Sequence, residues 1–581
     1  MPEKLRISKF LQSDWILASL LFAIFFITNG YIYAWDDQHL EIPLLKSLID
    51  PSLYPGDYYV QSLKNNFPSL FYAILARFIT TDQVPGAYFI LYVVSRFFLF
   101  FWMYKLWHFI SQKRSAAFLC VAVIILLGRV EEFLYRTFSH QEFALAIIMA
   151  GIYFFYRERL VLAALILGGA ANFHALYSLF PMIYLNVFVL IFLKESKWKI
   201  FLKSNLAFLL AASPAMFLII KKYAAGSVSV PPPLAEWLDL YLLTCSQNFI
   251  FQDISLEQVV SNLKTFFIAA RKYLFLILLY TVNLIYYRPF EKDHKIYAIS
   301  VSAVTMLAIS FVFTYIFPNR FVIDLNLIRN IQYLLFFYTG YVTLLFLEKT
   351  LNGKMLFGFL LGFLFMLLRI PSLDHYTPTY FTLAVIITAF LFLHGLWTWL
   401  DKRPRVALTQ RYLFLIIPLL VLFCAYSFFH YRYLKIVQYG PGFWQIQRNW
   451  IDMQKYVKQH TPQNALLLAP NDTEMGGFRI FSERSIVVCY RDCGIIGFDY
   501  PAAVEWKKRL KDVEGFCVLT KDQRALQQAL IKAILQYKVN YIVFMRYTES
   551  REDVPLLEKL YENEVFSLYK VKTNPVLNPV N

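Results

Sequence analysis

The sequence is poor in charged residues. Only 16% of its 581 residues are Asp, Glu, Lys or Arg, whereas 58% are hydrophobic and the mean hydropathy is +0.49. A soluble globular domain carries about 25% charged residues. Because the deficit extends along most of the chain, it argues against a soluble enzyme and predicts a polytopic α-helical membrane protein.

Several sequence motifs are also absent. The chain has no GxGxxG and no GxxxxGK[ST], which argues against a nucleotide-binding domain and an ATP-driven transporter. The first apolar segment is longer than a signal-peptide core and has no small-residue cleavage site, so we expect a retained span. The formal net charge of +17 fits cytoplasmic loops facing anionic lipid, and we expect no nucleic-acid partner.

Cysteine is scarce, with six residues in the whole chain. Cys489, Cys493 and Cys517 lie in the C-terminal part. If that part faces an oxidising compartment, two of them can pair and one thiol stays free. A zinc site is less favoured, because no histidine lies close to these cysteines in the sequence.

Long apolar runs mark the candidate membrane spans, each about 17 to 25 residues long. We predict about thirteen of them, at residues 14–34, 86–108, 115–129, 141–156, 159–173, 175–194, 202–220, 265–287, 296–317, 328–347, 354–371, 379–400 and 411–430. The run SLFYAILARFI (69–79) is too short to span a bilayer and predicts an interfacial helix.

Lysine and arginine predict the orientation. With the N-terminus in the cytoplasm, the cytoplasmic links each carry at least two basic residues: 113–114, 157–159, 194–203, 288–295, 349–354 and 402–411. An odd number of spans then places the tail outside. We therefore predict a transmembrane domain over 1–430 and an extracytoplasmic domain over 431–581.

The tail has the pattern of an α/β domain. Charged residues become common, and FWQIQRNWIDMQKYVKQH has helical periodicity. NALLLAP, SIVVCY and NYIVFMR are short apolar runs suited to buried strands. TKDQRALQQALIKAILQYK predicts a helix capped by Thr520. About 150 residues suffice for a core of their own.

Acidic residues open the first two predicted external loops. The long first loop, 35–85, begins with WDDQHLE and holds Asp36 and Asp37, and the second holds Glu131 and Glu132 in VEEF. A carboxylate at the membrane edge can act as a general base or bind a divalent cation such as Mg²⁺ or Mn²⁺. We take these four as candidate catalytic residues. The alternative is two unrelated, solvated loop starts.

A metal ion, if one is bound, would be held by Asp36, Asp37 and Glu132. The sequence leaves metal dependence open.

Other polar side chains near these loops are candidates for binding substrate. They are His39, His140, Arg136, Lys64, Arg320 and Arg329. A guanidinium can bind a lipid phosphate through two hydrogen bonds, and we favour Arg329 for this role because it stands at the mouth of a span. The alternative for each cation is an interfacial residue that reaches toward water. His174 either serves function or only satisfies backbone carbonyls in a tight external turn.

The layout resembles the GT-C superfamily of membrane glycosyltransferases. Its members have a cytoplasmic N-terminus, about eleven to thirteen spans and a long first external loop that begins with an acidic pair. In YAWDDQHLEIPLLKSLID, Asp36 or Asp37 stands at the position of the family's catalytic acid, and RVEEF matches a second acidic site more loosely. The fold that this implies is a GT-C-like helical membrane domain with an extracytoplasmic C-terminal α/β domain.

The resemblance implies an inverting transfer of sugar from a polyprenyl-phosphate or polyprenyl-diphosphate carrier. The acceptor would be a cell-envelope glycan, lipid or protein, and the location would be the bacterial inner membrane. The WWDxG motif of oligosaccharyltransferases is missing, which argues against transfer to asparagine.

Two other functions remain open from sequence. A polysaccharide polymerase or ligase would use similar donors but rely on arginines and a histidine in late external loops. A transporter, flippase or envelope scaffold would show paired half-helices or internal repeats. The early position of the acids favours the glycosyltransferase.

Overall fold

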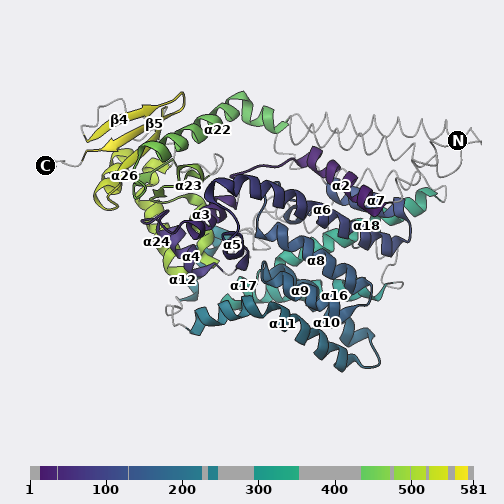
Figure 1. Cartoon of the computed structure of the whole chain (residues 1–581). Helices are drawn as coiled ribbons and strands as arrows, with labels where there is room; N and C mark the ends of the chain where they lie inside the picture. Colours follow the sequence, from purple (N-terminus) through teal and green to yellow (C-terminus); the bar gives the residue numbers. More distant parts are fainter. Residues whose placement is uncertain are drawn as a thin grey trace, which may run out of the picture.

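The computed structural model describes most of the chain as helices, with one sheet near the C-terminus. The residues described are 13–35, 37–67, 69–127, 130–224, 233–245, 280, 293–351, 434–470, 477–497, 499–517, 523–546 and 556–572. The sheet region lies at one side of the molecule, and helices α3, α4 and α5 lie between it and the apolar helices (Figure 1). Their bounds are Gln38–Ile49, Tyr58–Asn66 and Leu70–Leu75.

Five helical segments among the described residues are long and apolar enough to cross a membrane. They are Thr81–Ser111, Ala175–Phe192, Lys197–Leu218, His294–Ile316 and Arg320–Glu348. The first four correspond to α6 (Val84–Ser111), α10 (Ala175–Phe192), α11 (Lys197–Ala224) and α16 (His294–Phe311). The fifth contains α17 (Arg320–Asp324) and most of α18 (Ile331–Leu351). Further apolar helices are shorter: α2 (Asp14–Asn29), α7 (Arg114–Leu127), α8 (His140–Tyr156) and α9 (Leu160–Ala171). The chain is an integral membrane protein.

Nine of the predicted spans coincide with these helices, from the segment at 14–34 to the segment at 328–347. The other four, at 265–287, 354–371, 379–400 and 411–430, lie outside the described residues apart from Tyr280. The total of thirteen spans therefore stays a prediction. The predicted interfacial segment contains α5, and its Ile74 and Phe78 side chains are exposed.

Small residues let the apolar helices approach closely. A side chain at Gly168 of α9 would come within 2.3 Å of the Phe208 carbonyl oxygen on α11, whereas Gly169 has open space around it. A side chain at Gly340 of α18 would overlap the ring of Trp107 on α6. Small residues at helix interfaces are typical of membrane bundles, where close packing replaces the hydrophobic effect.

The C-terminal region contains a five-stranded mixed sheet. Its strands are β1 (Leu466–Leu468), β2 (Ser485–Ile486), β3 (Tyr541–Met545), β4 (Leu557–Glu562) and β5 (Phe566–Val571), in the order β2-β1-β3-β5-β4. The first three strands in that order are parallel, and the last two pair antiparallel. The helices are α22 (Leu434–His460), α23 (Phe478–Ser482), α24 (Tyr500–Asp512), α25 (Glu514–Cys517) and α26 (Gln523–Leu535).

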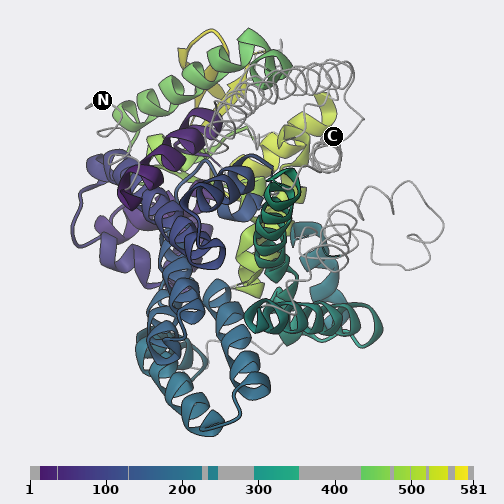
Figure 2. The same ribbon diagram turned by 90° about the vertical axis from the view of Figure 1, so that its right-hand side faces the viewer.

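The helices and strands predicted in the tail are present as a mixed α/β region. The predicted cap Thr520 lies outside the described residues. Cys489 is a free thiol. Figure 2 shows α22 (green) at one end of the molecule, with α10 and α11 (blue) at the other.

The C-terminal region is joined to the first predicted external loop by buried ion pairs. Arg479 of α23 donates to Asp57 through Nε at 2.6 Å and to both carboxylate oxygens of Asp492 at 2.7 and 2.9 Å. Lys46 of α3 lies 2.6 Å from Glu483. Removing one partner of a buried pair costs about 3–5 kcal/mol, because the other charge stays buried. Helices α3 and α4 are therefore fixed between the two parts of the chain.

Candidate active site

Polar side chains from four separate segments meet where the predicted external loops converge. Arg329, in the 3-10 turn Leu327–Asn330, interacts electrostatically with Glu132 and Asp37. It also lies within electrostatic range of His140 and His174. A guanidinium beside two carboxylates and two imidazoles is a cluster that can bind an anion and move a proton.

Glu132 is held in place by two neighbouring helices. It lies in the 3-10 turn Glu131–Phe133, and its carboxylate accepts a hydrogen bond from the Tyr177 hydroxyl on α10. Its backbone carbonyl accepts from Gln141 Nε2 at 2.7 Å. The carboxylate is therefore oriented before any substrate binds.

A histidine and a glutamate join the first two loops. His140 Nδ1 lies 2.9 Å from Glu41 Oε1 and 3.1 Å from the Tyr72 hydroxyl. A hydrogen bond between Nδ1 and the Glu41 carboxyl group joins helix α3 to the start of α8. Burial lowers the pKa of His140 to about 4. The imidazole is therefore neutral at neutral pH.

His174 lies parallel to His140, which places it in the same cluster. The two ring centroids are 5.3 Å apart and the planes differ by 11°. His174 precedes α10, and its side chain accepts from the Tyr177 backbone N–H. It thus caps a helix through a backbone N–H and also lies beside the candidate site, while a functional role for His174 stays a prediction.

Arg96, within α6, fixes the backbone of the second predicted external loop, 130–140, through hydrogen bonds. It donates to the carbonyls of Phe133 and Tyr135, the latter at 2.7 Å, and lies 3.7 Å from Glu142. The Arg96 side chain is fully buried. Sequence analysis missed this pair, although a lone arginine in one apolar run and a lone glutamate in another are a signal of intramembrane pairing.

The structure brings four of the predicted site residues together: Asp37, Glu132, His140 and Arg329. Asp36 and the side chain of Glu131 lie outside what the structure describes. Sequence reasoning noted Glu41 but gave it no role.

The other predicted residues have different neighbours in the structure. His39 is buried against Gly477, and burial lowers the pKa of its ring to about 3. Arg320 stacks on the Trp237 ring at 5.3 Å. Arg136 is within electrostatic range of Tyr92 on α6, and Lys64 lies in the last turn of α4.

The described side chains contain no group of three His, Cys, Asp or Glu residues that could hold a metal ion. One residue of the predicted set, Asp36, lies outside them. A metal ion held by Asp36, Asp37 and Glu132 thus stays an open alternative, and Arg329 supplies a positive charge within electrostatic range of Asp37 and Glu132.

Comparisons with known proteins give a family-model match and matches to solved structures. A protein-family model described as Domain of unknown function (DUF6798) matches residues 448–513, which include Arg479, Glu483 and Asp492. No curated protein matches the sequence. Among solved structures, the chain is similar to ArnT from Cupriavidus metallidurans bound to undecaprenyl phosphate, with 10% identity and a TM-score of 0.46.

That match covers 95% of this chain and 97% of the ArnT chain.

Proposed function

We propose that this protein is a membrane glycosyltransferase that uses a polyprenyl-phosphate-linked sugar. Its acceptor is a cell-envelope glycan, lipid or protein at the extracytoplasmic surface. The observation that carries the proposal is the proximity of Arg329 to Asp37 and Glu132, at the junction of loops that follow apolar helices. This arrangement supplies a phosphate-binding cation and a proton acceptor beside a membrane.

The proposed reaction is a single displacement at the sugar's anomeric carbon. The acceptor's hydroxyl oxygen forms the new bond to that carbon as the bond to the phosphate oxygen breaks. The phosphate leaves with the bonding electrons, and Arg329 stabilises its charge. Asp37 takes the acceptor's proton. One displacement inverts the configuration of the carbon.

The other side chains of the cluster position these groups. Tyr177 orients Glu132, which faces the same guanidinium as Asp37. Glu41 and His140 tie the helix that follows Asp37 to the start of α8. We assign Glu132 to orienting the acceptor, and the Glu41–His140 pair to keeping the two loops in register.

Transfer can be tested with purified protein in lipid nanodiscs. The donors are polyprenyl-phosphate sugars, the acceptor is a cell-envelope extract, and the readout is polyprenyl phosphate released together with sugar transferred. We expect Asp37→Asn to lower the transfer rate by about 10² or more, as general-base loss usually does. Asp36→Asn is measured beside it.

Asp82→Asn is the matched control, because Asp82 lies in the same predicted loop and its side chain is 89% exposed. It should keep the wild-type rate. Full activity in both the Asp36 and Asp37 variants would show that neither acid is catalytic. If wild-type protein releases no carrier from any donor, the transporter or scaffold alternative is favoured.

The orientation is tested separately. We propose a cytoplasmic N-terminus and an external tail, which puts the Arg329 cluster outside. A reporter fused after residue 581 should report an external location. A cytoplasmic signal would remove the candidate site from the side where lipid-linked sugars are consumed.

A further inference from the structure

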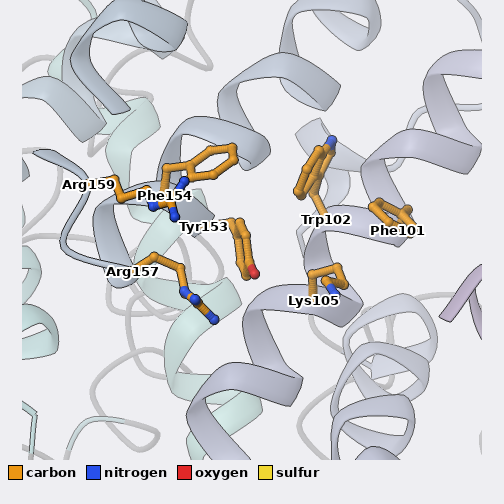
Figure 3. Close-up of a pocket in the computed structure, with 7 residues that line it drawn as sticks. All are labelled: Phe101, Trp102, Lys105, Tyr153, Phe154, Arg157 and Arg159. Carbon is orange, nitrogen blue, oxygen red and sulfur yellow. The ribbon is translucent and has the colours of Figure 1, made fainter. Parts of the chain in front are cut away.

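A cavity lies on the helical part of the molecule, away from the candidate active site. It is about 250 Å³ in volume and is lined by three cations and four aromatic side chains (Figure 3). These are Lys105, Arg157, Arg159, Phe101, Trp102, Tyr153 and Phe154. In Figure 3 the Tyr153 ring stands between Arg157 and Lys105. Nothing in the proposed sugar transfer uses these groups.

The cavity lies at the opposite ends of two helices that start at the candidate active site. On α8, Arg157 follows His140 by about 17 residues, or about 26 Å of helix. On α6, Lys105 follows Tyr88 by the same interval, and Tyr88 is within electrostatic range of Glu41. A bilayer's hydrocarbon core is about 30 Å thick. The cavity therefore lies at the other membrane surface.

The lining of the cavity keeps a net positive charge. Lys105 forms an ion pair with Asp14, with 2.9 Å between Nζ and Oδ2. Glu158, between the two arginines in the sequence, lies 2.9 Å from Lys295 instead. Among the described residues, neither Arg157 nor Arg159 is paired with a carboxylate, and Arg157 lies 5.4 Å from the centroid of the Phe109 ring. Aromatic rings beside cations are typical of the headgroup region.

An exposed apolar stripe on α6 leads to this cavity. Ile90, Val94 and Phe98 are 63%, 43% and 38% exposed and recur every four residues, so they share one face of the helix. One turn beyond Phe98 lies Trp102, which lines the cavity. The stripe and the cations are arranged as a hydrocarbon chain and a charged headgroup require.

We propose that this cavity binds an anionic phospholipid. The lipid phosphate contacts Arg157, Arg159 and Lys105, and one acyl chain lies along Ile90, Val94 and Phe98. Arginine and lysine pockets between membrane helices suit phosphate-containing headgroups, and aromatic walls suit the glycerol region. The site is independent of the proposed transferase activity.

The test is native mass spectrometry of the intact protein released from detergent with defined lipid. Phosphatidylglycerol, phosphatidylcholine and undecaprenyl phosphate are compared as probes. We expect wild-type protein to retain phosphatidylglycerol in preference to phosphatidylcholine. The double variant R157Q/R159Q should retain phosphatidylglycerol at least about fivefold less, given the strength of one basic residue near an anionic surface.

The matched control is K197Q/K199Q, which removes two charges from the first turn of α11, predicted to face the same side. It should retain phosphatidylglycerol like wild type. Equal losses in the two double variants would reduce the effect to general surface charge and overturn the proposal. So would a wild-type preference for undecaprenyl phosphate that depends on Arg157 and Arg159, or no preference between the two phospholipids.

Discussion

At the scale of single residues, buried arginines of this protein interact with polar groups from other segments. Arg96 and Arg479 donate hydrogen bonds to groups from segments distant in sequence, and Arg329 interacts electrostatically with such groups. A buried cation costs several kcal/mol of desolvation, which only well-placed acceptors offset. These three arginines therefore mark positions where distant segments of the chain are held together.

Arg329 is expected to need the shape of a guanidinium as well as its charge. Lysine keeps the charge but cannot form two parallel hydrogen bonds to a phosphate. We expect Arg329→Lys to lower kcat/KM by roughly 10- to 100-fold, measured as initial carrier release. Arg320→Lys is the control, because Arg320 lies over Trp237. Similar losses in both variants would contradict the assignment.

His140 should make stability depend on pH. Its pKa falls from 6.5 to about 4 on folding because of burial. Between these values the unfolded chain binds more protons, so stability is full above pH 6.5 and declines as pH falls toward 4. The decline should reach about 2–3 kcal/mol. Thermal unfolding in detergent measures it, and His140→Gln should flatten the curve between pH 4 and 6.5. An unchanged slope in that variant would assign the effect to other groups.

At the scale of helices, glycine residues at the contacts set how closely two helices approach each other. Gly168 lies against the Phe208 carbonyl, while its neighbour Gly169 has space. We expect Gly168→Val to destabilise the protein by several kcal/mol, since backbone cannot move aside as a side chain can. Gly169→Val, which carries the same loss of glycine, should cost about 1 kcal/mol or less. Melting temperatures of the two variants in one detergent decide this. Equal shifts would mean that α9 and α11 separate easily.

Helix α3 also explains why the sequence predicted part of the site and not the rest. His39 and Glu41 are two residues apart, and residues at that spacing lie on nearly opposite sides of a helix. Glu41 therefore faces His140 while His39 faces Gly477. Had the helix been predicted to start at Gln38, the two side chains could have been separated from sequence alone.

Apolar runs and strands were predictable because their pattern is local. The pairs that build the site are not: Glu41 and His140 are 99 residues apart, and Tyr177 and Glu132 are 45 apart. Each partner alone looks like an ordinary polar residue at the end of a span. Only the packing of helices, which no single sequence segment encodes, brings them into contact.

At the scale of the whole molecule, Arg479 connects the two parts of the chain. Replacing it by Gln leaves Asp57 and Asp492 buried without their cation. We expect Arg479→Gln to lower the free energy of unfolding by about 3–5 kcal/mol and to expose residues 38–66 to protease. Lys559→Gln, which breaks an exposed pair with Glu562, should cost below about 1 kcal/mol. If protease sensitivity of 38–66 is unchanged, the junction does not hold that segment.

The contact between α3 and the C-terminal region can form only late in the synthesis of the chain. Lys46 and the Ile480 carbonyl that it contacts are 434 residues apart. At about 5–20 residues per second, the ribosome supplies the second partner roughly 20–90 seconds after the first. Until then, helices α3 and α4 lack their contacts with the C-terminal region. A chain that ends prematurely in the tail would thus carry every residue of the candidate site and still lack the frame that holds it.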